Sequence, residues 1–210
     1  MAFGFLTNKE LKNEFPILVP GATFEESQAG GASYDLNLGA EVYVSGKEYP
    51  EILTRDQPYV SLPRGQFALL MTDERVEMPS NYIGMISIKF SIKKLGLINV
   101  SGFHIDPGYK GRIIFSVFNA GPSDVVLKYK DPVFMIFFFR LEHDAKPYNK
   151  SGYMNLPVDL VTSLKGTSAS LSGVDKRVRD LEVTNKIYWS LLIVLIGALI
   201  ALFLRGTIGN

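Results

Sequence analysis

A stretch at residues 102–112, GFHIDPGYKGR, combines an acid, a tight turn and an aromatic ring. The pair Pro107 and Gly108 predicts a β-turn, with Asp106 just before the turn and Tyr109 just after it. A carboxylate next to a flat ring with a polar tip can hold a sugar hydroxyl or position a water molecule. The alternative is a β-turn without a chemical role, and the stretch alone does not decide between the two.

The rest of the chain offers few other reactive groups. It has two histidines, His104 and His143, and no cysteine, so a zinc site would have to be built mainly from carboxylates and is not expected. The lack of cysteine also excludes a thiolate nucleophile. The sequence contains neither a phosphate-binding P-loop nor a dinucleotide-binding glycine motif. The acid and the ring around the predicted turn are therefore the main candidates for chemistry.

Charge and length limit the kinds of partner. The 210 residues carry 22 Lys plus Arg against 21 Asp plus Glu, for a net charge of +1. A nucleic acid polymer is not expected as a partner, because nothing supplies the basic field that would attract it. A small ligand or a protein partner fits this composition better. The chain is long enough for one domain of ordinary size in front of its C-terminal segment.

Local patterns predict a mainly β domain that positions these groups. Thr7 and Glu10 form a capping-box pattern, which predicts a short helix over about 7–15 that Pro16 and Pro20 stop. From residue 33 to 142, β-rich runs alternate with turns rich in Gly, Pro, Asn and Asp. This arrangement is typical of an antiparallel sandwich or barrel. The predicted strands include 41–44, 67–72, 84–88, 112–118 and 133–141.

The run at 134–139, FMIFFF, places apolar residues on both faces of a strand. A strand that faced water on one side would carry polar residues there. We therefore expect this strand to be buried twice, once in its own domain and once against a neighbouring subunit. The alternative is a central strand of a monomeric sandwich.

The uncharged run at 187–204, IYWSLLIVLIGALIALFL, predicts a single transmembrane helix in contact with membrane lipid. About 18 residues at roughly 1.5 Å rise per residue cross most of a hydrocarbon core of about 30 Å. Lys and Arg residues are concentrated before the run, between 176 and 186, which favours a β domain in the cytoplasm. The N-terminus lacks a signal-peptide pattern, so a tail-anchored protein is expected. The alternative is a buried core helix.

A linker and a stem are expected between a β domain at 1–150 and the transmembrane run. Residues 151–170 are mostly small and polar, with a short helix predicted at 158–164. From 171 to 186 apolar residues recur at heptad spacing, and the pattern continues into the transmembrane run. This spacing predicts a parallel helix bundle, in which Asn185 sets the register. The alternative is an amphipathic stem on a monomer.

Five short motifs follow one another along the β domain. They are ASYDLNLG at 32–39, LPRGQFALL at 62–70 with Thr72, Glu74 and Pro79, KLGL at 94–97, IDPGYKG at 105–111, and Asn119. In order and spacing, these motifs resemble the dCTP deaminase and dUTPase family over about residues 5–148. The resemblance implies a distorted β-barrel or jelly-roll-like domain that assembles as a homotrimer. It also implies that a deoxypyrimidine triphosphate, dUTP or dCTP, binds with Mg²⁺ between subunits.

The resemblance assigns roles to three residues. Asp35 matches the family's aspartate near the triphosphate and the metal, although it can equally stabilise its own turn. Asp106 matches the acid that meets the deoxyribose and, in dUTP hydrolysis, orients the attacking water. Tyr109 matches the residue beneath the sugar. These assignments make Asp106 the candidate catalytic residue.

The phosphate-binding stretch differs from the family pattern. The family reads GRSSLARLGL where residues 88–97 read IKFSIKKLGL. Lys89, Ser91 and Lys94 are the candidate phosphate ligands here, and the lysines keep positive charge but lose the two-pronged geometry of arginine. We therefore expect triphosphate binding to persist in weakened form.

The catalytic glutamate of the deaminases corresponds to Ser116. A serine hydroxyl does not act as a base near neutral pH without a partner, and loss of general acid–base help slows a reaction by about 10² to 10⁴. Deamination is therefore not expected. Hydrolysis of dUTP depends less on this position, because Asp106 and a metal can do the central work. The small polar stretch at 165–173 lacks the arginine and aromatic residue of the family's C-terminal arm, and it is interpreted as a linker.

Three hypotheses remain. The first is a membrane-tethered enzyme that acts on dUTP or dCTP. The second is a trimer that binds these nucleotides without turnover and reports their level at the membrane. The third is a structural trimeric head on a membrane stem. The direction of the two lysines and the surroundings of Ser116 discriminate among them.

Overall fold

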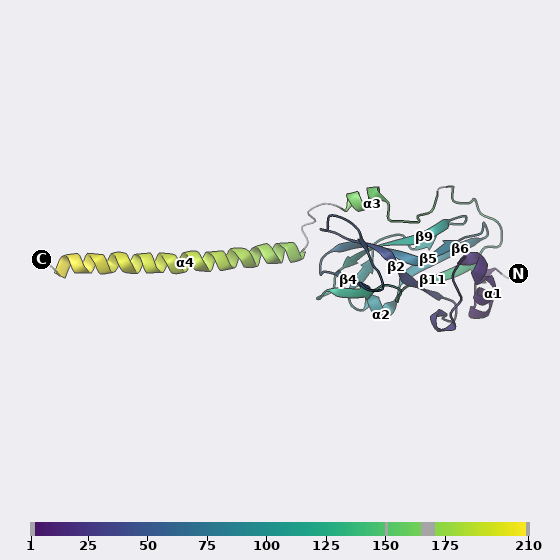
Figure 1. The fold of residues 1–210 in the computed structure, drawn as a ribbon, viewed down its shortest axis with the longest axis horizontal. Helices are drawn as coiled ribbons and strands as arrows, with labels where there is room; N and C mark the ends of the chain where they lie inside the picture. The colour runs from purple at the N-terminus through teal and green to yellow at the C-terminus, as the bar shows by residue number, and fades with distance from the viewer. Residues whose placement is uncertain (1–2, 150, 165–170, 209–210) are drawn as a thin grey trace. The chain divides into compact units, whose positions relative to one another are not determined.

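The computed structural model describes residues 3–149, 151–164 and 171–208. It divides into two compact units, Met1–Ser168 and Ala169–Asn210 (Figure 1). The first unit holds all the described strands, and the second is a helix. The predicted mainly β fold is therefore confirmed for the first unit.

The N-terminal segment consists of strand β1 (Gly4–Phe5) and helix α1 (Asn8–Leu18). The predicted capping box is present, because Glu10 Oε2 accepts hydrogen bonds from the backbone N (3.0 Å) and the hydroxyl (2.7 Å) of Thr7. The predicted end at residue 15 is wrong, since the helix includes Pro16 and continues to Leu18, two residues before Pro20. Proline removes only one backbone donor, and burial of Phe15 and Leu18 in the core holds the last turn in place.

The described strands form one curled antiparallel sheet of nine strands and a separate two-stranded sheet (Figure 1). The order in the large sheet is β7-β9-β5-β2-β11-β6-β8, with β1 beside β11 and β3 beside β2. Strands β4 and β10 form the small sheet. Four of the five predicted strands lie within longer observed ones, and the fifth, predicted at 133–141, overlaps β11, which ends at Arg140. The remaining bounds are β2 (Tyr34–Val44), β3 (Glu51–Ile52), β4 (Tyr59–Leu62), β5 (Phe67–Glu77), β6 (Tyr82–Ile88), β7 (Leu97–Asn99), β8 (His104–Ile105), β9 (Lys110–Asn119), β10 (Val125–Lys128) and β11 (Pro132–Arg140), with short helical turns η1 (Glu26–Gln28), α2 (Phe90–Lys93) and α3 (Val158–Ser163).

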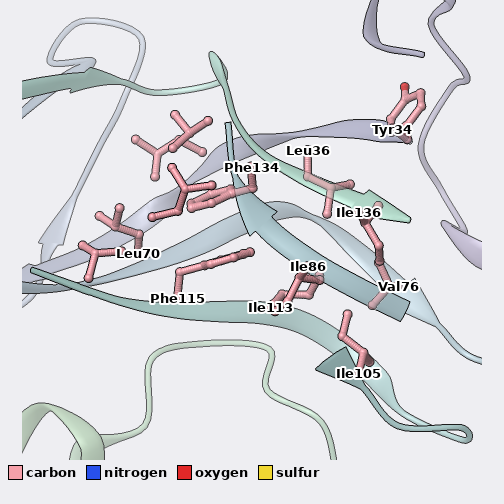
Figure 2. Close-up of a cluster of buried hydrophobic side chains, with 14 of the residues drawn as sticks. Tyr34, Leu36, Leu70, Val76, Ile86, Ile105, Ile113, Phe115, Phe134 and Ile136 are labelled. Carbon is pink, nitrogen blue, oxygen red and sulfur yellow. The ribbon is translucent and has the colours of Figure 1, made fainter. Parts of the chain in front are cut away.

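The core fills the inside of the curled sheet (Figure 2). Along β9 every second side chain is buried, which is the alternation expected of a strand with one face on a core. Phe115 of β9 stacks on Phe134 of β11 with ring centroids 4.2 Å apart and ring planes 10° from parallel. Burial of each such large apolar side chain stabilises the fold by about 1.5–3 kcal/mol.

Strand β11 lies between β2 and β6, with two different faces. Phe134, Ile136 and Phe138 point into the core and are buried, as predicted for one side of the strand. Phe137 and Phe139 point to the opposite face and are only partly buried. The second burial, against another subunit, stays a prediction.

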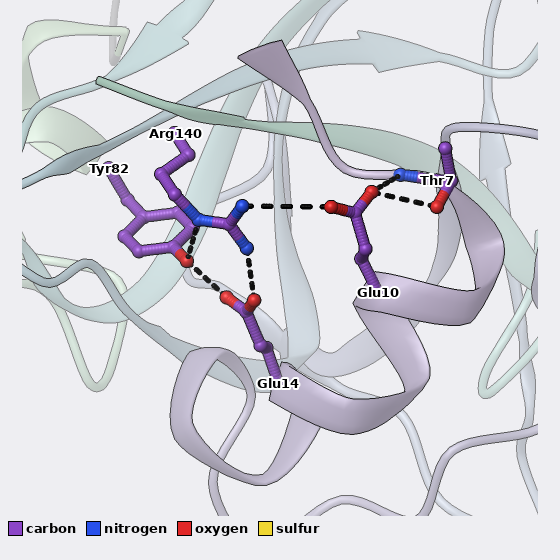
Figure 3. Close-up of polar contacts among 5 residues, drawn as sticks. All are labelled: Thr7, Glu10, Glu14, Tyr82 and Arg140. Carbon is purple, nitrogen blue, oxygen red and sulfur yellow. Dashed lines mark hydrogen bonds and ion pairs between the residues drawn. The ribbon is translucent and has the colours of Figure 1, made fainter. Parts of the chain in front are cut away.

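A buried arginine ties helix α1 to the end of β11 (Figure 3). The side chain of Arg140 forms an ion pair with Glu14 of α1, and its Nε donates to the Tyr82 hydroxyl at 2.7 Å. Glu10 lies 3.6 Å from the same guanidinium. Because Arg140 is only 5% exposed, these partners compensate a charge that water does not reach.

A second buried charge, Glu74, joins β5 to β2. Its carboxylate accepts hydrogen bonds from the backbone N of Asn37 (2.9 Å) and from Asn37 Nδ2 (2.7 Å). The pairing of both strands is irregular in this region. The Glu74 carboxylate therefore accepts a hydrogen bond from a backbone N that has no partner in the regular strand pairing there. Burial raises the pKa of Glu74 to about 7, because the charged form loses its hydration.

The second unit is the helix α4 (Leu171–Ile208). Within the part whose side chains are described, Arg177–Ala198 is long and apolar enough to cross a membrane, by length and composition only. The predicted stem at 171–186 and span at 187–204 both fall inside this single helix. The side chains of 171–176, 199 and 201–204 lie outside the described residues, so the heptad stem stays a prediction. Residues 165–170, the second part of the linker predicted at 151–170, also lie outside the described residues.

Candidate functional site

The predicted turn at Pro107 and Gly108 connects β8 to β9. Asp106 and Tyr109 flank it, and the backbone N of Tyr109 donates to the Asp106 carbonyl at 3.2 Å. Gly108 has a φ of +81°, and a Cβ on this residue would lie 2.6 Å from the Cβ of Pro147. Glycine is therefore required at the turn, both for its backbone conformation and for the close approach of the later segment.

Asp106 and Tyr109 share a cavity of about 210 Å³. The Tyr109 hydroxyl donates to the carbonyl of Arg112 at 2.5 Å, and burial raises the pKa of Tyr109 above its usual range, which keeps the hydroxyl protonated. Asp106 is half exposed, with Oδ1 3.4 Å from Nε2 of His104. The other residues that line the cavity are Ile86, Ser101, Gly102, Ile105, Ile113, Ile114, Tyr148 and Tyr153.

Tyr148 and Tyr153 are site residues that the sequence analysis missed. Tyr148 is fixed by a hydrogen bond from its backbone N to the Pro107 carbonyl (2.6 Å), and its ring lies 5.7 Å from that of Tyr109. Tyr153 reaches the site because its carbonyl accepts from the backbone N of Arg112 at 2.7 Å. The available signal was two tyrosines in an otherwise small and polar segment, which was interpreted only as the approach to a linker.

Ser116 lies in an adjoining cavity of about 220 Å³. The two cavities share Ser101, Ile114 and Tyr153 in their walls. The other lining residues are Leu69, Leu160, Ser163 and Leu164. No carboxylate or imidazole among the described residues lines this second cavity, so no group beside Ser116 is placed to act as a base.

The candidate phosphate ligands lie elsewhere on the chain. Asp35 of β2 forms an ion pair with Lys89, which precedes helix α2. Lys89 and Ser91 line an open groove of about 460 Å³ together with residues of β4, β10 and β11. Lys94 is exposed at the end of α2 and lines none of the described cavities that contain the other candidates.

Within one chain, strand β6 separates the turn residues Asp106 and Tyr109 from the candidate phosphate ligands near Lys89. Ile105, next to Asp106, pairs with Gly84 on β6. Lys89 lies past the far end of β6, which at about 3.3 Å per residue places it more than about 15 Å from Gly84. That separation is longer than the reach from the sugar to the last phosphate of a nucleotide.

The carboxylates near the candidate phosphate ligands suit a Mg²⁺ ion only if substrate phosphates supply most of its other ligands. The described residues contain no cluster of three or more His, Asp or Glu side chains that could hold a metal ion. Mg²⁺ typically keeps several waters and binds through one or two carboxylates together with substrate phosphates. Asp35 is a single carboxylate beside a cation, so it fits a Mg²⁺ ion that arrives with a triphosphate and does not fit a preformed metal site.

Comparisons with known proteins identify a family and several relatives. The family model "dCTP deaminase-like" matches residues 6–141. The dCTP deaminase of Thermococcus kodakarensis is 36% identical over 126 residues, which cover 60% of this chain and 79% of that protein. The dCTP deaminase of Thermococcus gammatolerans is 36% identical over 138 residues, covering 65% of this chain and 84% of that protein.

A solved structure supports the same fold. The 2'-deoxycytidine 5'-triphosphate deaminase of Agrobacterium tumefaciens superposes with a TM-score of 0.58 at 17% identity. The match covers 67% of this chain and half of that chain, so it concerns the fold of the β unit. The family assignment rests on the family model, which spans more than half of the chain. The chain belongs to the dCTP deaminase-like family.

Proposed function

We propose that this chain binds deoxypyrimidine triphosphates between the subunits of a homotrimer and hydrolyses dUTP to dUMP and pyrophosphate. The observation that carries the proposal is the pair of adjoining cavities. One holds Asp106 beside Tyr109 and Tyr148, and the other holds Ser116 without an acid or base. The first cavity suits a sugar and a positioned water, whereas the second lacks the group that deamination needs.

Asp106 is the residue proposed to position water. Its side chain is half exposed, so its carboxylate oxygens can reach a water molecule in the cavity. The carboxylate accepts a hydrogen bond and then a proton from this water, while the water oxygen attacks the α-phosphorus. The bond from the α-phosphorus to the bridging oxygen breaks, and pyrophosphate leaves. Tyr109 supports the sugar, so that the α-phosphate is held in line with the attacking water.

Lys89, Ser91 and Lys94 are proposed to bind the phosphates, contributed by a different subunit from Asp106. Their separation from Asp106 along β6 supports this division between copies. A bound Mg²⁺ would neutralise charge on the phosphates and polarise them toward attack. Asp35 would be its protein ligand once the ion pair with Lys89 opens, and Lys89 would then be available to a phosphate.

The trimer is proposed to form through one apolar surface. Phe5, Ile83, Met85, Phe137 and Phe139, called here the aromatic face, lie on the outer side of β1, β6 and β11. Phe5 contacts Phe139 edge to face with ring centroids 5.0 Å apart, yet remains 53% exposed. A contiguous apolar surface of this kind is typical of a protein interface.

Helix α4 is proposed to anchor the chain in a membrane, with the β unit in the cytoplasm. Its apolar stretch and its exposed side chains support this role. The test is membrane flotation of the full chain against a variant with Leu192→Lys and Leu195→Lys, which places two charges in the apolar stretch at about 2.5–3.5 kcal/mol each. Glu182→Lys is the matched control. Equal flotation of all three proteins would contradict anchoring by this helix.

A nucleotide sensor without turnover is the second candidate, and the neutral surroundings of Ser116 favour it. One experiment separates the two. The full chain in detergent is incubated with dUTP or dCTP and Mg²⁺, and products are resolved by chromatography. Release of dUMP and pyrophosphate from dUTP, with no dUTP formed from dCTP, supports the enzyme. Binding of both nucleotides by calorimetry without any product supports the sensor, and no binding contradicts both.

A further inference from the structure

Strand β8 places an imidazole and a carboxylate on one side of the chain. His104 is the first residue of β8, and Asp106 directly follows the strand. Residues two apart on an extended chain point to the same side, whereas the residue between them points to the other. Ile105, between the two, is 5% exposed and belongs to the buried cluster of Figure 2. His104 and Asp106 both line the cavity of about 210 Å³ that also contains Tyr109.

The backbone of both residues is held by neighbouring contacts. His104 is paired with Met85 in the antiparallel pairing of β8 with β6. The Asp106 carbonyl accepts the backbone N of Tyr109 at 3.2 Å, which closes the turn after β8. The sheet and the turn therefore fix the backbone positions of His104 and Asp106, and rotation of the two side chains is the freedom that remains.

The two side chains lie close to each other. Nε2 of His104 is 3.4 Å from Oδ1 of Asp106. In the described part of the chain, His104 is the one side chain within hydrogen-bond or ion-pair range of this carboxylate. This distance is long for a hydrogen bond, and contacts between catalytic groups typically shorten when a substrate enters the site. The orientation of the Asp106 carboxylate therefore depends on His104.

Orientation matters because the Asp106 side chain is 53% exposed, so little else restricts its rotation. A neutral imidazole that donates its Nε2 hydrogen to Oδ1 holds one carboxylate oxygen and leaves Oδ2 free to accept from a water molecule. A base is effective only when it is held in the reactive geometry, and a misplacement of about 1 Å costs about a hundredfold in rate.

We propose that His104 is a positioning residue for hydrolysis: it holds the Asp106 carboxylate so that the free oxygen faces the attacking water. This inference rests on the proposed hydrolysis of dUTP and adds a residue that acts through Asp106. The proton of the water passes to Asp106 as in the proposed reaction, and His104 neither gains nor loses a proton in this role. Removal of His104 is therefore expected to lower kcat and to leave nucleotide affinity unchanged.

Steady-state release of pyrophosphate from dUTP by the full chain in detergent with Mg²⁺ tests this role. His104→Leu removes the donor and is expected to lower kcat by roughly tenfold, with an affinity for the non-hydrolysable α,β-imido analogue of dUTP within about threefold of the unmodified chain. His104→Gln keeps an N–H donor and is expected to retain at least about half of kcat. His143→Leu, at an exposed position after β11, is the matched control and is expected to change neither value.

A double-mutant cycle separates positioning from a purely structural effect. In the Asp106→Asn background, His104→Leu is expected to change the residual kcat by less than about twofold, because the group on which His104 acts is gone. Three results would each overturn the inference and leave the proposed hydrolysis standing: an unchanged kcat in His104→Leu, an equal loss in His104→Gln, or an undiminished effect in the Asp106→Asn background. Absence of turnover by the unmodified chain would overturn the proposed hydrolysis and this inference together.

Discussion

Lys89 and Asp35 form an ion pair across β11, although they lie on opposite sides of that strand. Asp35 is on β2, opposite Met135, and Lys89 follows β6, with its backbone N donating to the Val133 carbonyl at 3.0 Å. Both side chains are partly buried, at 25% and 18% exposure for Lys89 and Asp35. The positive charge of Lys89, which is proposed to bind phosphate, is thus partly neutralised by Asp35 before a ligand arrives. Phosphate binding therefore has to replace the Asp35 carboxylate as the partner of Lys89.

Lys89→Met is therefore expected to weaken dUTP binding by roughly ten- to hundredfold, because a charge-assisted contact contributes about 1.5–3 kcal/mol. Deoxyuridine, which has no phosphate, is expected to bind equally to both proteins. Calorimetric titration with both ligands measures the difference. Lys47→Met is the matched control, since Lys47 pairs with Glu51 at the surface. Equal loss for dUTP and deoxyuridine would contradict a phosphate role.

Glu74 gives the fold a pH dependence with a defined sign. Its pKa is about 7 in the folded chain against an ordinary value of 4.5, so the folded state holds the proton more tightly. Stability is therefore expected to fall as pH rises from about 4.5 to 7, by up to about 3 kcal/mol from this group. Glu74→Gln removes the titration and keeps an acceptor for Asn37. Urea unfolding of both proteins at pH 5 and pH 8 measures the effect. The change in unfolding free energy between the two pH values should be smaller in the variant, because all other titrating groups contribute equally to both proteins. An equal change in both proteins would contradict a raised pKa of Glu74.

The contact between α1 and the sheet depends on Glu14. Glu14→Gln is expected to destabilise the fold by roughly 3 kcal/mol, because it leaves the buried Arg140 with only the more distant Glu10 as a carboxylate partner on α1 (Figure 3). Glu26→Gln removes a surface ion pair with Lys12 and is expected to change stability by less than about 1 kcal/mol. Chemical denaturation of both variants gives the comparison, and similar effects would show that the Arg140 network is not important for stability.

The aromatic face carries the prediction about assembly. Phe139→Asp is expected to convert the trimer into monomers, because an unpaired charge would be buried at the interface. Ile52→Asp, at a position 61% exposed on β3, is the control that should leave assembly unchanged. Analytical ultracentrifugation of the full chain in detergent distinguishes the two states. A trimer that survives Phe139→Asp would place the interface elsewhere.

The strands were predictable because each has its own local signal. The five β-rich runs fall on observed strands, although β2 begins seven residues before its predicted run and β5 ends five residues after its own. The alternation along β9 follows from burial of one face. The C-terminal end of α1 could not be predicted in this way, because packing of Leu18 in the core overrides the tendency of Pro16 to end a helix. Propensity is local, whereas the energy that decides such a boundary comes from residues distant in sequence.

The site was predictable only where its residues are neighbours in sequence. Asp106 and Tyr109 share a turn and were identified together. Tyr148 and Tyr153 reach the same cavity from a later segment through backbone contacts, which side-chain patterns do not reveal. The pairing of Lys89 with Asp35 depends on the order of β2, β11 and β6 in the sheet, and no spacing in the sequence encodes that order.

Asp106 is the residue proposed to give the nucleotide-binding cavity its hydrolytic activity. The most direct test measures pyrophosphate release from dUTP by the full chain in detergent with Mg²⁺, for the unmodified protein, Asp106→Asn and the exposed control Asp56→Asn. We expect turnover by the unmodified protein and the control, and a loss of roughly 10² or more in kcat for Asp106→Asn with little change in dUTP affinity. Equal turnover in all three proteins, or none in the unmodified protein, would contradict the claim.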